Sequence, residues 1–188
     1  FLADARPWPN YQDDYRPFVE YAKAEGLMVL AANVPRILAA QVSREGLDAV
    51  LGNPNAAREV SAPQDEYWEA FGEAMSEHGG VGDEEALLRF YQAQCLKDDT
   101  MAETIVDYLE KARQRGLDPM VVHITGRMHS DRGMGTVARV RNRDPGLKIA
   151  LVGMESVGDV AEADPPLGTV DHIDVSFAAG CGFQRNGV

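Results

Sequence analysis

The sequence has few cysteines, no long apolar run and no excess of basic residues, and each shortage excludes a class of protein. Its 188 residues include only two cysteines, Cys95 and Cys181, which excludes a disulfide framework but allows a single bridge. No apolar stretch approaches the roughly 18 residues of a transmembrane helix. The 18 basic and 30 acidic residues give a formal net charge of −12, which argues against nucleic-acid binding.

Several short motifs that mark a specific chemistry are absent as well. No His-x-x-x-His, Cys-x-x-Cys or His-Glu-x-x-His spacing occurs, so the sequence contains no local zinc motif. The lack of Cys-x-x-Cys-His excludes covalent attachment of a c-type haem. There is no Walker loop, no dinucleotide-binding glycine motif and no Gly-x-Ser-x-Gly elbow of a serine hydrolase.

The patterns that are present predict an α/β fold, with a mostly parallel sheet flanked by helices. Hydrophobic residues make up 45% of the chain, as in a globular protein. Short buried apolar runs alternate with amphipathic helical patterns, as they do in parallel sheets. Strands are expected at residues 27–32, 120–124, 148–152 and, at the sheet edge, 170–177. We expect one domain over residues 1–177 and a flexible tail over residues 178–188.

An acidic helical insertion, or lid, is expected at about residues 53–85. Between Glu59 and Glu85 the chain has nine acidic residues and no lysine or arginine. Trp68, Phe71 and Met75 recur at helical spacing, which predicts a short amphipathic helix inside this segment. The same aromatic and acidic stretch is also a candidate docking surface.

Two polar loops follow predicted strands, and ligands of open α/β sheets bind at such carboxyl ends. One loop is Asn33 to Arg36, and the other is Gly126 to Ser130. His129 has the chemistry of a metal ligand, a base or a donor to an anion, although it is equally suited to capping the next helix. Residues 120–150 carry six basic and two acidic residues, and Arg127 and Arg132 are placed to receive carboxylates or phosphates.

The segment from residue 90 to residue 103 places polar side chains beside apolar helix faces. Gln94, Asp98 and Glu103 need partners if they are buried. One interpretation is a ligand site, in which Tyr91 supplies a phenolate to ferric iron, since tyrosine is a known axial haem ligand. The other is a pair of packed helices that break at residues 97–99, with Thr100 and Glu103 forming a capping box.

Three blocks together give the sequence a family resemblance. Residues 32–36, 90–103 and 126–130 resemble the ChaN-like haem-binding lipoproteins of the Tiki/TraB/erythromycin-esterase-like superfamily, and their order and spacing match from about Tyr15 to Phe177. The resemblance implies a parallel-sheet α/β fold and a bacterial envelope protein of the periplasm or membrane surface, often lipid-anchored and linked to iron or haem uptake. In the ChaN type, two haems stack in a dimer and tyrosine ligates iron.

The resemblance also implies paired Gly-x-x-His motifs. Gly126 and His129 match the second motif, and the first, normally near the N-terminus, does not occur in this chain. We therefore expect the N-terminal part of the domain, including any membrane anchor, to be missing from this sequence.

Three functions follow from these observations. The first is non-covalent haem binding without enzymatic activity, in a homodimer or a larger envelope complex, with Tyr91 or His129 as the iron ligand. The second is a hydrolase that uses paired Gly-x-x-His motifs, with or without a divalent metal. The third is an accessory subunit of an envelope assembly that has kept the fold without a ligand. The candidate haem-binding residues are Asn33, Arg36, Tyr91, Gly126, Arg127, His129 and Arg132.

Overall fold

The computed structural model describes residues 7–77, 79, 82–157 and 175–178, and helices dominate this part of the chain. The longer helices are α2 (Arg16–Ala24), α3 (Arg36–Glu45), α4 (Glu66–Glu77), α5 (Glu84–Gln114) and α6 (Gly135–Arg143). The short helical turns are η1 (Tyr11–Tyr15), η2 (Leu47–Val50), η3 (Arg127–His129) and η4 (Asp131–Gly133). Two strands, β1 (Met154–Val157) and β2 (Val175–Ala178), pair in parallel, with Met154 opposite Val175.

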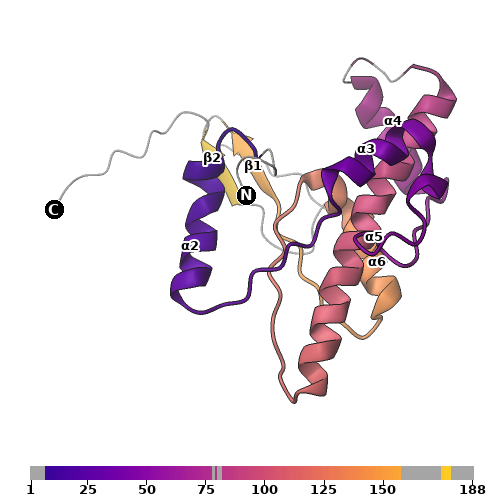
Figure 1. The fold of residues 1–188 in the computed structure, drawn as a ribbon. Helices are drawn as coiled ribbons and strands as arrows, with labels where there is room; N and C mark the ends of the chain where they lie inside the picture. Colours follow the sequence, from indigo (N-terminus) through magenta and orange to yellow (C-terminus); the bar gives the residue numbers. More distant parts are fainter. Residues whose placement is uncertain (1–6, 78, 80–81, 158–174, 179–188) are drawn as a thin grey trace.

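The 31-residue helix α5 is the element around which the others pack. Its start is fixed by Asp83, whose side chain accepts a hydrogen bond from the Ala86 backbone N–H at 2.8 Å. In Figure 1, α3, α4 and α6 surround α5, whereas α2 stands apart from this group. Within the described ranges, no helix combines the length and the apolar character that are needed to cross a membrane.

Three hydrophobic clusters attach the neighbouring helices to α5. The first joins α3 to α5 and includes Leu38, Val42 and Leu96. The second joins α6 to the C-terminal half of α5 through Ile105, Leu109 and Val140. The third is aromatic and joins α4 to α5, with members Tyr67, Phe71, Tyr91 and Cys95. Helix α5 thus packs against neighbours on several sides, which explains why its hydrophobic pattern does not follow one stripe.

The predicted α/β fold with a mostly parallel sheet is wrong. The apolar runs at residues 27–32, 120–124 and 148–152 are extended but form no strand, and the paired strands in the described ranges are limited to β1 and β2. Apolar side chains in these runs face solvent, with Met28 70% and Met120 87% exposed. Apolar composition alone favours a strand, but a strand also needs a hydrogen-bonding neighbour, and these runs have none.

The helix expected around Trp68, Phe71 and Met75 is confirmed, because these residues lie in α4. The expected break at residues 97–99 is wrong, because α5 continues through it. Residues 170–174 of the expected edge strand, and the expected tail apart from Ala178, lie outside the described residues.

Candidate functional site: a buried carboxylate–histidine pair

Two adjacent carboxylates, Asp98 and Asp99, lie buried in the middle of α5. Asp98 is 0% exposed and Asp99 is 3% exposed. Burying a carboxylate is costly unless it is paired or hydrogen-bonded, so the neighbours of each one explain why the sequence tolerates it. The two side chains meet different partners, because adjacent residues of a helix point about 100° apart.

Asp98 accepts hydrogen bonds from three side chains on three different segments. The hydroxyl of Tyr67, at the start of α4, donates to Oδ2 at 2.7 Å. The hydroxyl of Thr136, in α6, donates to Oδ1 at 2.7 Å. Nδ1 of His129, in η3, lies 2.8 Å from the same Oδ1. Residues far apart in the sequence therefore converge on one carboxylate.

The Asp98 contact fixes the orientation of the His129 imidazole. A carboxylate accepts hydrogen bonds, so we assign the proton to Nδ1, which leaves Nε2 with a free lone pair. The His129 side chain is 16% exposed, whereas Asp98 is completely buried behind it. The amide nitrogen of Gln94 lies 3.2 Å from Nδ1 and 3.1 Å from the Tyr67 hydroxyl, so it closes the cluster on another side.

Gly135 allows His129 to lie this close to α6. Gly135 has a φ of +54°, and a Cβ added there would lie 2.6 Å from the His129 carbonyl oxygen. Any other residue would push the η3 turn away from the start of α6. Gly126, which the loop pattern singled out, has a φ of −72° that any residue adopts. The close approach in this loop therefore depends on Gly135.

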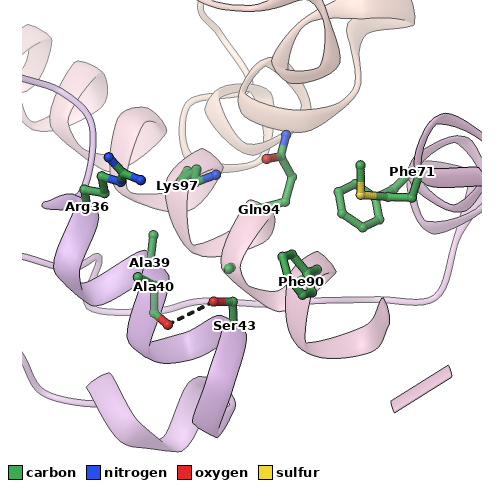
Figure 2. Close-up of a pocket in the computed structure, with 10 residues that line it drawn as sticks. Arg36, Ala39, Ala40, Ser43, Phe71, Phe90, Gln94 and Lys97 are labelled. Carbon is green, nitrogen blue, oxygen red and sulfur yellow. Dashed lines mark hydrogen bonds between the residues drawn. The ribbon is translucent and has the colours of Figure 1, made fainter. Parts of the chain in front are cut away.

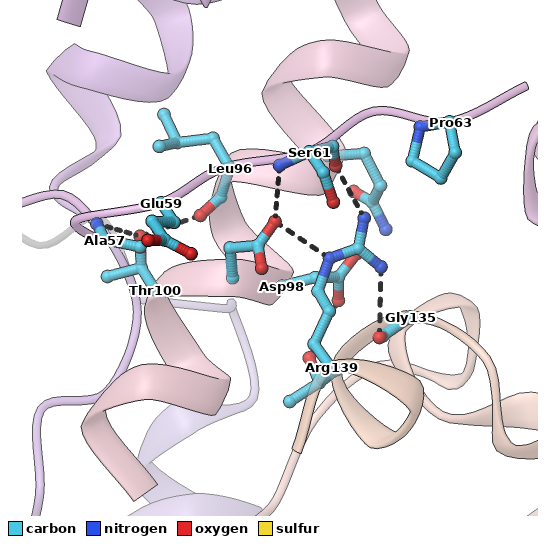
Figure 3. Close-up of polar contacts among 12 residues, drawn as sticks. Ala57, Glu59, Ser61, Pro63, Leu96, Asp98, Thr100, Gly135 and Arg139 are labelled. Atoms are coloured by element: carbon cyan, nitrogen blue, oxygen red, sulfur yellow. Dashed lines mark hydrogen bonds and ion pairs between the residues drawn. The ribbon is translucent and has the colours of Figure 1, made fainter. Parts of the chain in front are cut away.

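Asp99 is held by permanent cations instead. Nε of Arg139 lies 3.0 Å from Oδ2, and Nη1 of Arg143 lies 2.8 Å from Oδ1. The Ser61 backbone N–H also donates to Oδ2, at 3.1 Å. Arg139 donates further to the Gly135 and Ser61 carbonyls, as Figure 3 shows. Burial alone lowers the pKa of Arg139, but the nearby Cys95, Asp99 and Asp98 together raise it by more, so the guanidinium stays charged.

Hydrogen bonds around Asp99 connect residues 57–61, which precede α4, to α5 and α6. Arg143 donates to the Glu59 carbonyl at 3.1 Å, and the Ala57 N–H donates to the Thr100 hydroxyl at 3.2 Å. Glu103 accepts from the Arg58 N–H at 3.2 Å. Thr100 and Glu103 therefore hold this segment in place, and the predicted capping box is wrong because α5 does not begin there. Figure 3 shows the Ala57–Thr100 contact beside the contacts of Arg139.

The hydroxyl of Tyr91, the predicted phenolate ligand, is engaged in another contact. It donates to the Pro63 carbonyl at 2.8 Å. The ring packs edge-on against Trp68, with centroids 5.1 Å apart, and against Tyr67 at 5.7 Å. Burial raises the pKa of Tyr91 above its ordinary value, and burial together with Asp98 does the same for Tyr67. Both phenols therefore stay protonated and act as donors.

The other predicted residues are dispersed around this cluster. Arg127 and Arg132 flank His129, where Arg127 pairs with Asp131 at 2.9 Å and Arg132 lies 3.9 Å from Glu66. Arg36 begins α3 and lines a groove between α3, α4 and α5 that also reaches Gln94. Asn33 lies in the loop before α3. The structure thus brings His129 together with Asp98, whereas Arg36 belongs to the neighbouring groove.

A second imidazole, that of His123, lies near the cluster. Burial lowers the pKa of His123, and the proximity of His129 lowers it further. Its Nε2 is buried and has no hydrogen-bond partner within the described part of the chain. This nitrogen therefore lacks the partner that a buried polar atom usually has.

Sequence reasoning identified His129 but missed the residues that hold it. Asp98 was marked as a polar residue in need of a partner, and that was the available signal. Tyr67, Thr136 and Gly135 carried no motif, and they become significant only through their distances to Asp98 and His129. Across residues 7–77, 79, 82–157 and 175–178, no three histidine, cysteine, aspartate or glutamate side chains form a cluster that could hold a metal ion.

Comparison with known proteins agrees with the family resemblance. The family model described as "Haem-binding uptake, Tiki superfamily, ChaN" matches residues 1–140, so the chain belongs to this family. No curated protein and no solved structure matched the chain. The matched range includes α5, His129 and Thr136, and therefore the whole Asp98 cluster.

Proposed function

We propose that this protein binds haem non-covalently and that Nε2 of His129 ligates the iron. The observation that carries the proposal is the 2.8 Å contact between Nδ1 of His129 and the buried Asp98. Metal-ligating histidines almost always donate their other N–H to a carboxylate, a carbonyl or a water, which fixes the ring and raises the basicity of the ligating nitrogen. Asp98, held in turn by Tyr67 and Thr136, is such a partner.

The donor set suits haem better than a bare divalent ion. A zinc ion needs at least three protein ligands, and the described residues contain no cluster of that size. When haem is bound, its porphyrin supplies four nitrogens and the iron needs only one or two ligands from the protein. One oriented imidazole is therefore enough, and Arg127 and Arg132 flank it as candidate partners for the propionates.

Between the two candidate ligands, the geometry favours His129 over Tyr91. The Tyr91 hydroxyl is donated to Pro63, and its ring lies within the aromatic cluster of α4 and α5. Ligation through Tyr91 requires this packing to open and a raised pKa to be overcome. Ligation through His129 does not require a phenol to lose its proton. The envelope location, the dimer and the membrane anchor implied by the family resemblance stay predictions.

A haem titration followed by absorption spectroscopy tests the proposal. The protein should shift the Soret band of added haem at micromolar concentration. His129→Ala should weaken haem binding by about tenfold or more, because the iron loses its protein ligand. Tyr91→Phe is the matched control and should leave both the band position and the affinity unchanged. A Soret shift that persists in His129→Ala and disappears in Tyr91→Phe would assign the ligand to Tyr91 instead.

A second candidate function is a hydrolase, because the same pair suits proton transfer. A carboxylate that accepts from Nδ1–H orients a histidine for general-base catalysis at Nε2. This hypothesis predicts hydrolysis of an ester or amide substrate that is lost in both His129→Ala and Asp98→Ala. Activity that survives both substitutions would reject it.

A further inference from the structure

The groove between α3, α4 and α5 combines apolar walls with two positive charges. Its volume is about 320 Å³. Phe71 and Met75 of α4 and Phe90 of α5 are the large apolar residues of its lining, and the small residues Ala39 and Ala40 of α3 leave the space open. Figure 2 shows Arg36 and Lys97 at one side of the groove and Phe71 and Phe90 at the other. The groove is therefore polarised from a cationic side to an aromatic side.

The two cations of the groove lack acidic partners. Neither Arg36 nor Lys97 forms an ion pair with a carboxylate in the described ranges, whereas Arg89 pairs with Glu85 at 2.6 Å and Arg113 with Asp144 at 2.7 Å. Lys97 is half-buried, and its burial lowers the pKa of its ammonium group by more than the charge of Asp98 raises it. A partly desolvated cation that is paired directly with no carboxylate is unfavourable, so an anion beside Lys97 is stabilising there.

We propose that this groove is a binding site for a small apolar molecule that ends in a carboxylate. Arg36 and Lys97 hold the carboxylate, and Phe71, Met75 and Phe90 contact the apolar body. The assignment rests on charge complementarity: a neutral apolar ligand leaves both cations unpaired, and a small inorganic anion leaves the aromatic wall in water. It does not depend on iron ligation by His129.

Two sources can supply this chemistry, a free fatty acid and the propionate edge of a porphyrin. Gln94 makes the second source relevant, because its side chain lines the groove and its amide contacts His129 and Tyr67. In Figure 2, the Gln94 amide points away from α3, between the cationic and aromatic sides of the groove. The Asp98–His129 cluster and the groove therefore share the side chain of Gln94. The experiment must distinguish a fatty acid from a porphyrin as the source of the carboxylate.

Isothermal titration calorimetry with decanoate as the probe tests the groove directly, with decanol as the uncharged control. Decanoate should bind, and decanol should bind about tenfold or more weakly, since hydrogen bonds to charged groups are the stronger ones. Arg36→Gln and Lys97→Met should each weaken decanoate binding to a similar extent. Arg44→Gln is the matched control, because Arg44 is exposed on the same helix but does not line the groove.

The variants keep the test decisive even if one of them folds poorly. Arg36 is exposed, so Arg36→Gln leaves the core intact, and far-UV circular dichroism checks the half-buried Lys97→Met. The proposal is overturned if decanoate does not bind, or if it binds wild type, Arg36→Gln and Lys97→Met equally. Equal binding of decanol and decanoate overturns it as well, because the cations then have no part in recognition.

Competition between decanoate and haem identifies the source of the carboxylate. If haem propionates occupy the groove, decanoate should displace haem, and Arg36→Gln should weaken haem binding. If a fatty acid is the ligand, decanoate and haem should bind together without competition. Decanoate titrations of His129→Ala, together with the haem titrations, separate this proposal from the proposed function. If decanoate binds but no form of the protein shifts the Soret band of haem, haem binding is rejected and the proposal of a carboxylate site in the groove is retained.

Discussion

Asp98 and Asp99 are adjacent residues of α5 and both are buried, but their hydrogen-bond partners differ in kind. Asp99 faces two arginines and a backbone N–H, with distances of 2.8 to 3.1 Å. Asp98 faces two neutral hydroxyls and an imidazole at similar distances. A guanidinium never loses its charge, whereas an imidazole changes charge near neutral pH and binds metals. We infer that Asp99 serves stability and that Asp98 serves function.

The two environments are also coupled. The Arg139 guanidinium that binds Asp99 lies 5.6 Å from the centre of the Tyr67 ring, and Tyr67 donates to Asp98. Tyr67 therefore packs against the structural network on its ring face and supports the functional pair through its hydroxyl. Rigid support of this kind keeps a ligating side chain in one orientation.

The largest expected effect is on stability. Asp99→Ala leaves the buried Arg139 and the partly exposed Arg143 without their carboxylate, and breaking one partner of a buried ion pair costs about 3–5 kcal/mol. Urea denaturation should show this loss of unfolding free energy. Asp107→Ala is the control, because Asp107 pairs with the exposed Arg58 at 2.7 Å and should matter much less. Equal losses in the two variants would contradict a structural role that is specific to Asp99.

The second effect separates the two aspartates by function. Asp98→Asn removes the charged acceptor of the His129 Nδ1–H, and loss of such a partner typically lowers metal affinity by about 10–100-fold. Asp99→Asn, provided that it folds, should bind haem as the wild type does. Haem titrations of both variants measure the difference. If Asp99→Asn lowers haem affinity as much as Asp98→Asn, the division between the two carboxylates is wrong.

Features that depend on a local sequence signal could be predicted from the sequence, whereas features that depend on contacts between distant residues could not. Helix α4 was predictable because its signal is local, the helical spacing of Trp68, Phe71 and Met75. The strands were not, since apolar composition at residues 120–124 says nothing about whether a neighbouring strand is present. His129 stood out through its loop. Its partner Asp98 lies 31 residues earlier, and no local pattern encodes that contact.

The third effect compares two tyrosines that pack against each other. Tyr67→Phe removes one of the donors to the buried Asp98, and leaving a buried group short of a partner costs about 1–3 kcal/mol. Tyr91→Phe removes only a hydrogen bond to the Pro63 carbonyl and should cost about 1 kcal/mol. Thermal or urea unfolding ranks the two. A larger loss in Tyr91→Phe would place the more important hydroxyl outside the Asp98 cluster.

The smallest expected effect is on how the unfolding free energy depends on pH. Burial and the nearby His129 lower the pKa of His123 below its ordinary value of 6.5. As the pH falls through 6.5, the unfolded chain therefore binds a proton before the folded chain does, and stability falls. His123→Gln should reduce this loss in unfolding free energy between pH 7 and pH 5. An unchanged pH dependence in the variant would mean that His123 is not desolvated as described.

The central claim, that Asp98 presents His129 as an iron ligand, is tested most directly by chemical rescue. His129→Gly removes the imidazole and leaves Asp98, Tyr67 and Thr136 in place. The variant should lose the Soret spectrum of the wild-type haem complex, and added free imidazole should restore it, with weaker restoration when Asp98→Asn is combined with His129→Gly. A wild-type spectrum in His129→Gly without imidazole would contradict the account.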